Sequence, residues 1–343
     1  MNSRQPKHLR KLRWLVWLAL PLALWWLARQ FPLQELFQAF RVVSLPGLIT
    51  LIAFNLFAMF FFSGRWWLIL RSLGYRLPYF ALFRYRLAAF SVSYFTPGTQ
   101  FGGELLQVYA LERQHGLPRA VALASVALDK LFELLANLSF LAFGVLLILQ
   151  HSLFGNADPP LAIGWISGLL LLPLGYLLAL GFGRAPLTRL LASLPQRLLQ
   201  KAKLVRLKAL AHETEMQIAG LVRCKPRAVL SILLASLWIW ALSLGEFWLA
   251  ASVLGANLSL LQAALALSAA RLAFLLPLPG GLGALEASQV LALQSLGYSP
   301  ALGLAISLWI RARDITLGAL GFFWGALLAQ SDPVIPLSPE AGD

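Results

Sequence analysis

The sequence is poor in the residues that soluble enzymes use for chemistry and for solubility. Only 12% of its 343 residues are charged, whereas soluble domains hold about 25%. A single cysteine, Cys224, excludes an internal disulfide, and the four histidines are too scattered to ligate a metal. The sequence has no Walker A loop, zinc motif or nucleophile elbow. We therefore expect no enzyme, no metal site and no cofactor.

Long apolar runs make up most of the chain instead. The hydrophobic fraction is 59%, and a membrane-spanning helix needs about 20 apolar residues. Because no small-residue cleavage site follows the basic start and the first run, an uncleaved first span is favoured over a signal peptide. We expect six full spanning helices, at 14–30, 46–64, 120–149, 161–183, 228–254 and 301–328. Two further apolar stretches, 80–95 and 258–276, each run into a Pro/Gly-rich break.

The basic residues lie mainly between these runs. We therefore interpret the net charge of +14 as membrane orientation and not as nucleic-acid binding. Of the 28 Lys and Arg, 22 lie in segments 1–13, 65–86, 113–119 and 184–227. Segment 255–300 holds only Arg271. The positive-inside rule then predicts that the four segments rich in Lys and Arg, and both termini, are cytosolic. This arrangement requires that six helices cross the membrane and that each broken stretch enters and leaves on the same side.

The sequence predicts a single integral-membrane domain over residues 1–330, with one sizeable cytosolic loop, 184–227. The basic, Leu-rich part of this loop, from Leu187 to Leu210, is typical of an amphipathic helix lying on anionic lipid, although a solvated connector also fits. The acidic, Pro-containing tail, 331–343, is predicted to be disordered.

An internal repeat is found when the chain is compared with itself at an offset of 182 residues. The gapless alignment places Pro97-Gly98 on Pro279-Gly280, Glu104 on Glu286, and Pro118 on Pro300. The two units cover about 80–149 and 258–328. Since three full spans separate the breaks, the second unit would be inverted relative to the first, as in many transporters whose substrate site lies between the repeats. Chance similarity of two apolar segments is the alternative.

Each unit contains a Pro/Gly break, at 96–103 and at 277–283, that a helix cannot continue through. Irregular backbone persists at membrane depth only where it is buried in protein or lines a wet cavity. The half-helix after each break begins with free amide groups, which attract anions such as a phosphate; a kink for packing also fits. The candidate binding glycines are Gly98, Gly102, Gly103, Gly280, Gly281 and Gly283.

Charged residues inside the span 120–149 are predicted to face the protein interior, because a charge in lipid is costly. Asp129, Lys130 and Glu133 lie within one arc of a helix at 100° per residue. Lys130 and Glu133 are three residues apart and can form an ion pair.

The span 301–328 carries Arg311 and Asp314 on one face, while Arg313 points elsewhere and needs its own partner. Arg311 occupies the position equivalent to Asp129 in the repeat. We expect these two residues to pair across the pseudo-two-fold axis, as part of the site or as a static salt bridge.

Two glutamates and two arginines complete the candidate site. Glu104 and Glu286 open the half-helices, where a carboxylate either caps the helix or faces the cavity to meet a proton or a cationic headgroup. Arg86 and Arg271 lie on the apolar approach segments and could bind a phosphate.

These motifs carry a resemblance to a known family. They are Arg65-Trp66-Trp67, the break ending in Gly102-Gly103-Glu104, the break from Pro277 to Glu286, and Arg311. Over about residues 10–328 the chain resembles the flippase-like transmembrane domain of lysylphosphatidylglycerol synthases, which also occurs as stand-alone membrane proteins. Where that family has an acidic-Arg pair, this chain has Asp129-Lys130, which removes the bidentate fork of arginine.

The resemblance implies transfer of a lipid between the leaflets of a bacterial inner membrane. Because only 13 residues follow Gln330, we expect no aminoacyl-transferring domain and no synthesis of lysyl-phosphatidylglycerol by this chain. The leading hypothesis is a lipid flippase or scramblase, with an anionic phospholipid as its partner. The alternatives are an accessory subunit that docks a lipid- or glycan-modifying enzyme through 187–210, and an intramembrane lipid transferase.

Overall fold

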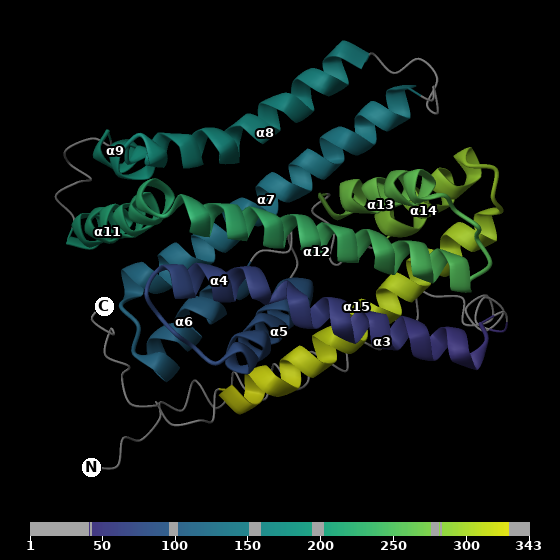
Figure 1. Cartoon of the computed structure of the whole chain (residues 1–343), viewed down its shortest axis with the longest axis horizontal. Helices are drawn as coiled ribbons and strands as arrows, with labels where there is room; N and C mark the ends of the chain where they lie inside the picture. The colour runs from purple at the N-terminus through teal and green to yellow at the C-terminus, as the bar shows by residue number, and fades with distance from the viewer. Residues whose placement is uncertain are drawn as a thin grey trace.

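Helices make up all the regular structure among the residues that the structure, a computed structural model, describes. These residues are 41, 43–95, 102–150, 159–193, 202–275, 281 and 283–328. The expected first span, 14–30, and the expected disordered tail, 331–343, lie outside them, as do Gly98 and Gly280. The helical bundle in Figure 1 agrees with the expected all-α class.

Two helical segments are long and apolar enough to cross a membrane. One is α3 (Leu45–Phe62), which α4 (Gly64–Ser72) continues after a single residue; the other is α12 (Pro226–Val253). The first segment extends beyond the predicted span 46–64, because the helix continues after the apolar run ends. Arg65, which the sequence placed in a cytosolic segment, is therefore inside the bundle and 3% exposed.

A third candidate span combines the part of α8 (Pro159–Gly181) from Gly168 onward with α9 (Pro186–Ala192), across a bend of 92°. The next described helix is α11 (Ala202–Cys224). The predicted single helix from Leu187 to Leu210 is therefore wrong. α9 ends at Ala192, where the backbone amide of Ser193 donates to Arg189 O at 3.0 Å and closes the last turn.

A buried carboxylate fixes the bend between α8 and α9. Glu215 of α11, 1% exposed, accepts hydrogen bonds from the amides of Leu187 and Thr188 at 2.8 and 2.9 Å, and from the hydroxyls of Thr188 and Tyr176 at 2.6 and 2.9 Å. Amides at a helix start have no helical partner, so a carboxylate there satisfies them and complements the helix dipole. This carboxylate therefore anchors the start of α9 to α11, while α9 itself has no buried residue.

The first repeat unit is a helical hairpin followed by one long helix. Its helices are α5 (Tyr79–Phe95), α6 (Gly103–His115) and α7 (Arg119–Gln150). α6 runs back along α5, since Gly103 N donates to Ser93 Oγ at 3.0 Å and Tyr85 Oη lies 2.9 Å from His115 Nε2. α6 ends at Gly116, whose φ of 64° suits glycine.

The second unit has the same order of helices, as the repeat predicts. Its helices are α13 (Leu260–Leu275), α14 (Ala284–Ser295) and α15 (Pro300–Leu328). α14 packs on α13, where Gln289 Nε2 donates to Ala266 O at 2.9 Å. Both segments thus have the same plan of two shorter helices followed by one long helix.

The long helix of each unit packs against a helix of the other unit. The long helix α15 crosses α5 of the first unit, and the long helix α7 contacts α13 of the second. Both crossings depend on small residues: a Cβ on Gly321 would lie 2.0 Å from Leu87 O, and one on Gly144 would lie 2.2 Å from Ser268 Oγ. Small residues let membrane helices approach closely, which is their usual use at such interfaces.

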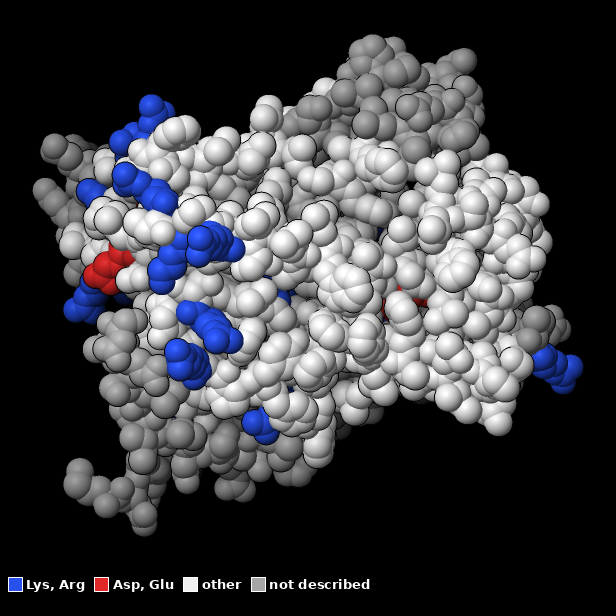
Figure 2. Space-filling view, viewed as in Figure 1, with Lys and Arg blue, Asp and Glu red and all other residues white. Residues whose placement is uncertain are grey.

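Exposed basic residues gather at one end of the molecule. Figure 2 shows Lys and Arg around the end where Figure 1 places α9 and α11, and a wide face beyond it with few charges. The exposed members are Arg71, Arg76, Arg113, Arg119, Arg184, Arg189, Lys203, Arg206, Arg223, Lys225 and Arg227. The exposed Lys and Arg of the described parts of three segments, 65–86, 113–119 and 184–227, are therefore on one side of the fold, while segment 1–13 lies outside the described residues and the compartment itself stays a prediction.

Candidate functional site

A cavity of about 310 Å³ lies between the two units and is lined by both. Side chains from α3 to α7 and from α12, α13 and α15 line it. Its charged lining consists of Arg65, Arg86, Lys130, Arg271 and Arg313 and of Glu104, Asp129, Glu133, Glu246 and Asp314. Five cations thus face five carboxylates, so the lining as a whole is neutral although it is densely charged.

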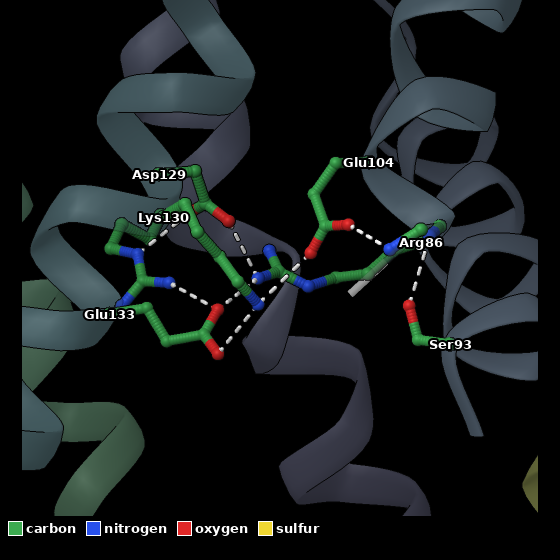
Figure 3. Close-up of polar contacts among 9 residues, drawn as sticks. Arg86, Ser93, Glu104, Asp129, Lys130 and Glu133 are labelled. Atoms are coloured by element: carbon green, nitrogen blue, oxygen red, sulfur yellow. Dashed lines mark hydrogen bonds and ion pairs between the residues drawn. The ribbon is translucent and has the colours of Figure 1, made fainter. Parts of the chain in front are cut away.

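Asp129 is the centre of the first charge cluster. Its two carboxylate oxygens each bind a different arginine: Arg65 Nε lies 2.7 Å from Oδ1 and Arg86 Nη2 lies 2.7 Å from Oδ2. Both arginines also lie near Glu133 Oε2, at 3.6 and 3.8 Å. Figure 3 shows Arg86, Asp129 and Glu133 pointing toward one another. Such charge-assisted contacts satisfy groups that would be costly to bury alone.

Lys130 joins this cluster to the start of α6. Its ammonium lies 3.1 Å from Glu133 Oε1, which confirms the predicted pair, and 3.2 Å from Glu104 Oε1 (Figure 3). The cluster therefore contains three cations and three carboxylates, and it is balanced only because α4 supplies Arg65 to the charges of the first unit.

The amides that open α6 already have protein partners. Gly102 N donates to Glu104 Oε2 at 2.8 Å, and Gly103 N donates to Ser93 Oγ at 3.0 Å. Glu104 therefore caps its own helix and faces the cavity at the same time. These contacts argue against a phosphate at Gly102 and Gly103. Gly103 has a packing role instead, because a Cβ there would lie 2.0 Å from Ala89 O.

A second charge cluster belongs to α12 and α15. Arg313 Nη1 lies 2.6 Å from Glu246 Oε1, and Arg313 Nε donates to Asp314 Oδ1 at 2.8 Å. Asn55 of α3 also donates to Glu246, at 2.7 Å. Arg313 thus has the separate partner that the sequence required. With one cation for two carboxylates, this cluster carries an excess of negative charge.

The predicted pair of Asp129 and Arg311 is wrong. Asp129 binds Arg65 and Arg86, whereas Arg311 binds Glu286, with Nε 2.8 Å from Oε1. The physical reason is that helix packing brings an opposite charge close to each residue. Arg65 of α4 and Arg86 of α5 reach Asp129, and Glu286 of α14 reaches Arg311. Arg311 is 2% exposed and does not line the cavity.

Arg271 is held differently from the other cavity cations. Its Cζ lies over the Trp240 ring, 5.1 Å from the centroid, and its Nε is buried without a hydrogen-bond partner. Trp240 in turn stacks on Phe140 of α7, with centroids 4.0 Å apart and planes inclined by 17°. A three-layer stack thus joins α7, α12 and α13.

The structure brings most of the predicted site residues together. Those that line the cavity are Arg86, Gly103, Glu104, Asp129, Lys130, Glu133, Arg271 and Asp314. Those that lie in the described chain but outside this lining are Gly102, Gly281, Gly283, Glu286 and Arg311. Among the described residues no group of His, Cys, Asp and Glu is arranged to hold a metal ion.

The lining also contains residues that were not among the predicted site residues, and three of them, Arg65, Glu246 and Trp240, show why. Arg65 was missed because it follows the end of an apolar run and was counted as a loop residue. Glu246 was missed although it is the single charged residue within the apolar residues of α12, a pattern that itself marks an interior site. Trp240 carried no signal, since aromatic residues are frequent in membrane helices.

No curated protein and no solved structure matches the chain. A family model described as "Lysylphosphatidylglycerol synthase TM region" matches residues 14–321, which include every residue that lines the cavity. With that match over most of its length, the chain belongs to the family of the lysylphosphatidylglycerol synthase transmembrane region.

Proposed function

We propose that the protein moves a phospholipid, or a related lipid with a polar headgroup, between the two leaflets of a membrane. The headgroup crosses through the charged cavity while the acyl chains remain in the bilayer. The observation that carries this proposal is the cavity itself, where ten charged side chains line a space within a bundle of apolar helices. The proposed activity is transport without a chemical step on the lipid.

The cost of this arrangement supports a transport role. Each charged residue at membrane depth costs at least about 2.5–3.5 kcal/mol on insertion scales, and such residues usually mark a substrate path. Several cavity side chains are partly open to this space: Lys130, Glu133 and Arg313 are 27%, 33% and 27% exposed. A volume of about 310 Å³ is at the lower end of the range for small-ligand sites, which suits a headgroup better than a whole lipid.

The arrangement of the units supports an inverted repeat with two re-entrant hairpins. α5 and α6 have 17 and 13 residues, or about 25 and 20 Å of helix, less than the ~30 Å hydrocarbon core. In Figure 1 the chain enters α7 near the end where α11 lies, and enters α15 near α13 and α14 at the other end. Two opposed hairpins beside one cavity would give the site a route to either side.

The basic end supports an orientation in a bacterial inner membrane. By the positive-inside rule, the end that contains α9 and α11 faces the cytosol, and with it both termini. The anionic headgroups of the cytosolic leaflet would attract the same end.

The test is lipid movement in vesicles that contain the purified full chain. Phosphatidylglycerol with a fluorescent acyl chain is placed in both leaflets, and an impermeant reductant bleaches the outer leaflet. The wild-type protein should render the inner-leaflet label accessible, whereas empty vesicles should keep it protected.

Asn137 and Ser139 of α7 offer a matched pair of variants. Asn137 lines the cavity, whereas Ser139 is exposed on the outside of the same helix. Asn137→Trp fills the cavity without removing a charge and should stop lipid movement, while Ser139→Trp should retain it. Wild-type rates in a folded Asn137→Trp protein would exclude this cavity as the lipid path. Bleaching curves identical to those of empty vesicles, with wild-type protein present, would exclude the function.

A further inference from the structure

Arg271 differs from the other cations of the cavity in having no carboxylate within contact distance. Within the described part of the chain, Arg65, Arg86, Lys130 and Arg313 each contact one or more carboxylates at 2.6 to 3.8 Å, and Arg271 contacts none. Its Nε–H is buried and unpaired. A guanidinium that is removed from water without an anionic partner is costly, and this cost is recovered only if an anion binds it.

The stack on Trp240 orients this free guanidinium. Its Cζ lies over the indole, 5.1 Å from the centroid, and Phe140 stacks on the same indole. This contact holds the guanidinium in the cavity lining, where its N–H groups can bind a ligand. These N–H groups are the part of arginine that matches the oxygens of a phosphate in a bidentate contact.

We propose that Arg271, positioned by Trp240, is the phosphate subsite of the cavity. This inference rests on the proposed function and assigns within it the atoms that recognise the substrate. The ligand is a phosphate group with two free oxygens, in a lipid headgroup or as the free ion. Arg86 is not equivalent, because Asp129 and Glu133 already neutralise it.

The position of Arg271 suits a site that changes its access during transport. Its stack joins α7 of the first unit, α12, and α13 of the second unit. A phosphate bound there would contact the boundary between the units, where relative movement of the units would change the geometry of the site. The negative excess of Glu246 and Asp314 lies in the same cavity and would keep the bound anion from being held too tightly to leave.

The experiment compares phosphate binding by two stacked arginines. Arg71 is the matched control: its Cζ lies 5.2 Å from the centroid of Trp67, but it is exposed at the basic end. Purified full-length wild type, Arg271→Gln, Arg271→Lys and Arg71→Gln are titrated in detergent with short-chain phosphatidylglycerol and, separately, with inorganic phosphate. The readout is the rise in the midpoint of thermal unfolding, from which an apparent Kd is obtained.

Wild type and Arg71→Gln should show the same saturable rise. Arg271→Gln should bind about 10- to 100-fold more weakly, the loss expected for a charged bidentate contact, and Arg271→Lys should be intermediate. Without ligand, Arg271→Gln should unfold at the wild-type midpoint or above, because it removes a charge that has no carboxylate partner and whose Nε is buried without a hydrogen bond. A purely structural arginine would instead give a lower midpoint.

The separate titrations with phosphatidylglycerol and with inorganic phosphate identify the source of the phosphate. Saturable binding of phosphatidylglycerol but not of inorganic phosphate would identify the ligand as a lipid headgroup. Equal binding of the two would identify the phosphate group alone. Either outcome supports the subsite. An unchanged Kd in Arg271→Gln, or no saturable binding by wild type, overturns it. Phosphate binding that depends on Arg271 in a protein that moves no lipid would retain the subsite and reject the transport function. Lipid movement together with an unchanged Kd in Arg271→Gln would retain the transport function and reject the subsite.

Discussion

Glu286 binds Arg311 through two contacts, with Nε at 2.8 Å from Oε1 and Nη2 at 3.1 Å from Oε2. The first unit has a similar contact, since Glu104 lies 3.2 Å from Lys130. In both units the glutamate that opens the half-helix binds a cation on the long helix that follows. The two contacts are similar although Lys130 and Arg311 are not at equivalent positions of the 182-residue offset, and the arginine supplies the bidentate geometry that the lysine lacks.

Removing Glu286 should destabilise the protein strongly. Glu286→Gln leaves Arg311, which is 2% exposed, without its counter-charge. Loss of one partner of a buried pair costs about 3–5 kcal/mol, whereas replacing both partners by apolar residues is often neutral. We therefore expect a large fall in the unfolding midpoint for Glu286→Gln and recovery in the double variant Glu286→Leu/Arg311→Met, measured by thermal unfolding in detergent.

The contact between Glu112 and Arg119 is the control for this prediction. It is also an ion pair, at 3.4 Å, but Arg119 is 69% exposed and Glu112 30%. Glu112→Gln should change stability by about 1 kcal/mol or less, as is usual for surface pairs. Equal losses for Glu112→Gln and Glu286→Gln would mean that burial does not set the strength of the Glu286 pair.

Neutralising Asp129 should be more damaging than neutralising Glu133. Asp129→Asn takes the 2.7 Å partner from both Arg65 and Arg86, whereas Glu133→Gln removes only their 3.6 and 3.8 Å contacts. We expect the free energy of unfolding to fall by on the order of 3 kcal/mol for Asp129→Asn and by less for Glu133→Gln. The measurement is thermal unfolding in detergent without a chemical denaturant. A larger loss in Glu133→Gln would contradict the central place of Asp129.

Much of this fold could be predicted from the sequence. The predicted spans 120–149 and 301–328 differ from α7 and α15 by one residue or less at each end. The reason is that long apolar runs and a proline before or at the helix start both act locally. The position of Asp129 and Lys130 in the cavity lining also agrees with their place on one helix face, because the angular spacing of residues is fixed along a helix.

The partners of the buried charges could not be predicted in the same way. Whether Asp129 binds Arg65, Arg86 or Arg311 depends on which helices pack against α7, and residue spacing within one helix contains no such information. The small residues at the crossings decide this packing: Gly321 lets α15 approach α5, and Gly144 lets α7 approach α13. In the sequence alone such glycines indicate close packing but not the neighbour.

The crossing of α15 and α5 gives a prediction with an internal control. Gly321→Ala would place a Cβ 2.0 Å from the backbone oxygen of Leu87, which cannot rotate away, so the two helices must separate. Gly325→Ala, one turn further along α15, would meet Ala88 Cβ at an ordinary 3.4 Å. We expect Gly321→Ala to cost on the order of 1–3 kcal/mol in unfolding free energy, and Gly325→Ala to be neutral or slightly stabilising because alanine favours helix.

The orientation of the basic end is tested by the single thiol. Cys224 is exposed at the end of α11, between Arg223 and Lys225, so a maleimide has free access to it from that side. In intact cells a membrane-impermeant maleimide should leave Cys224 unlabelled, and in inside-out membrane vesicles it should label it, because the positive-inside rule places this end in the cytosol. Cys224→Ser, which has no other thiol to react, gives the background for both preparations. Labelling in intact cells at the level seen in inverted vesicles would place α11 outside the cell and reverse the proposed direction of both hairpins.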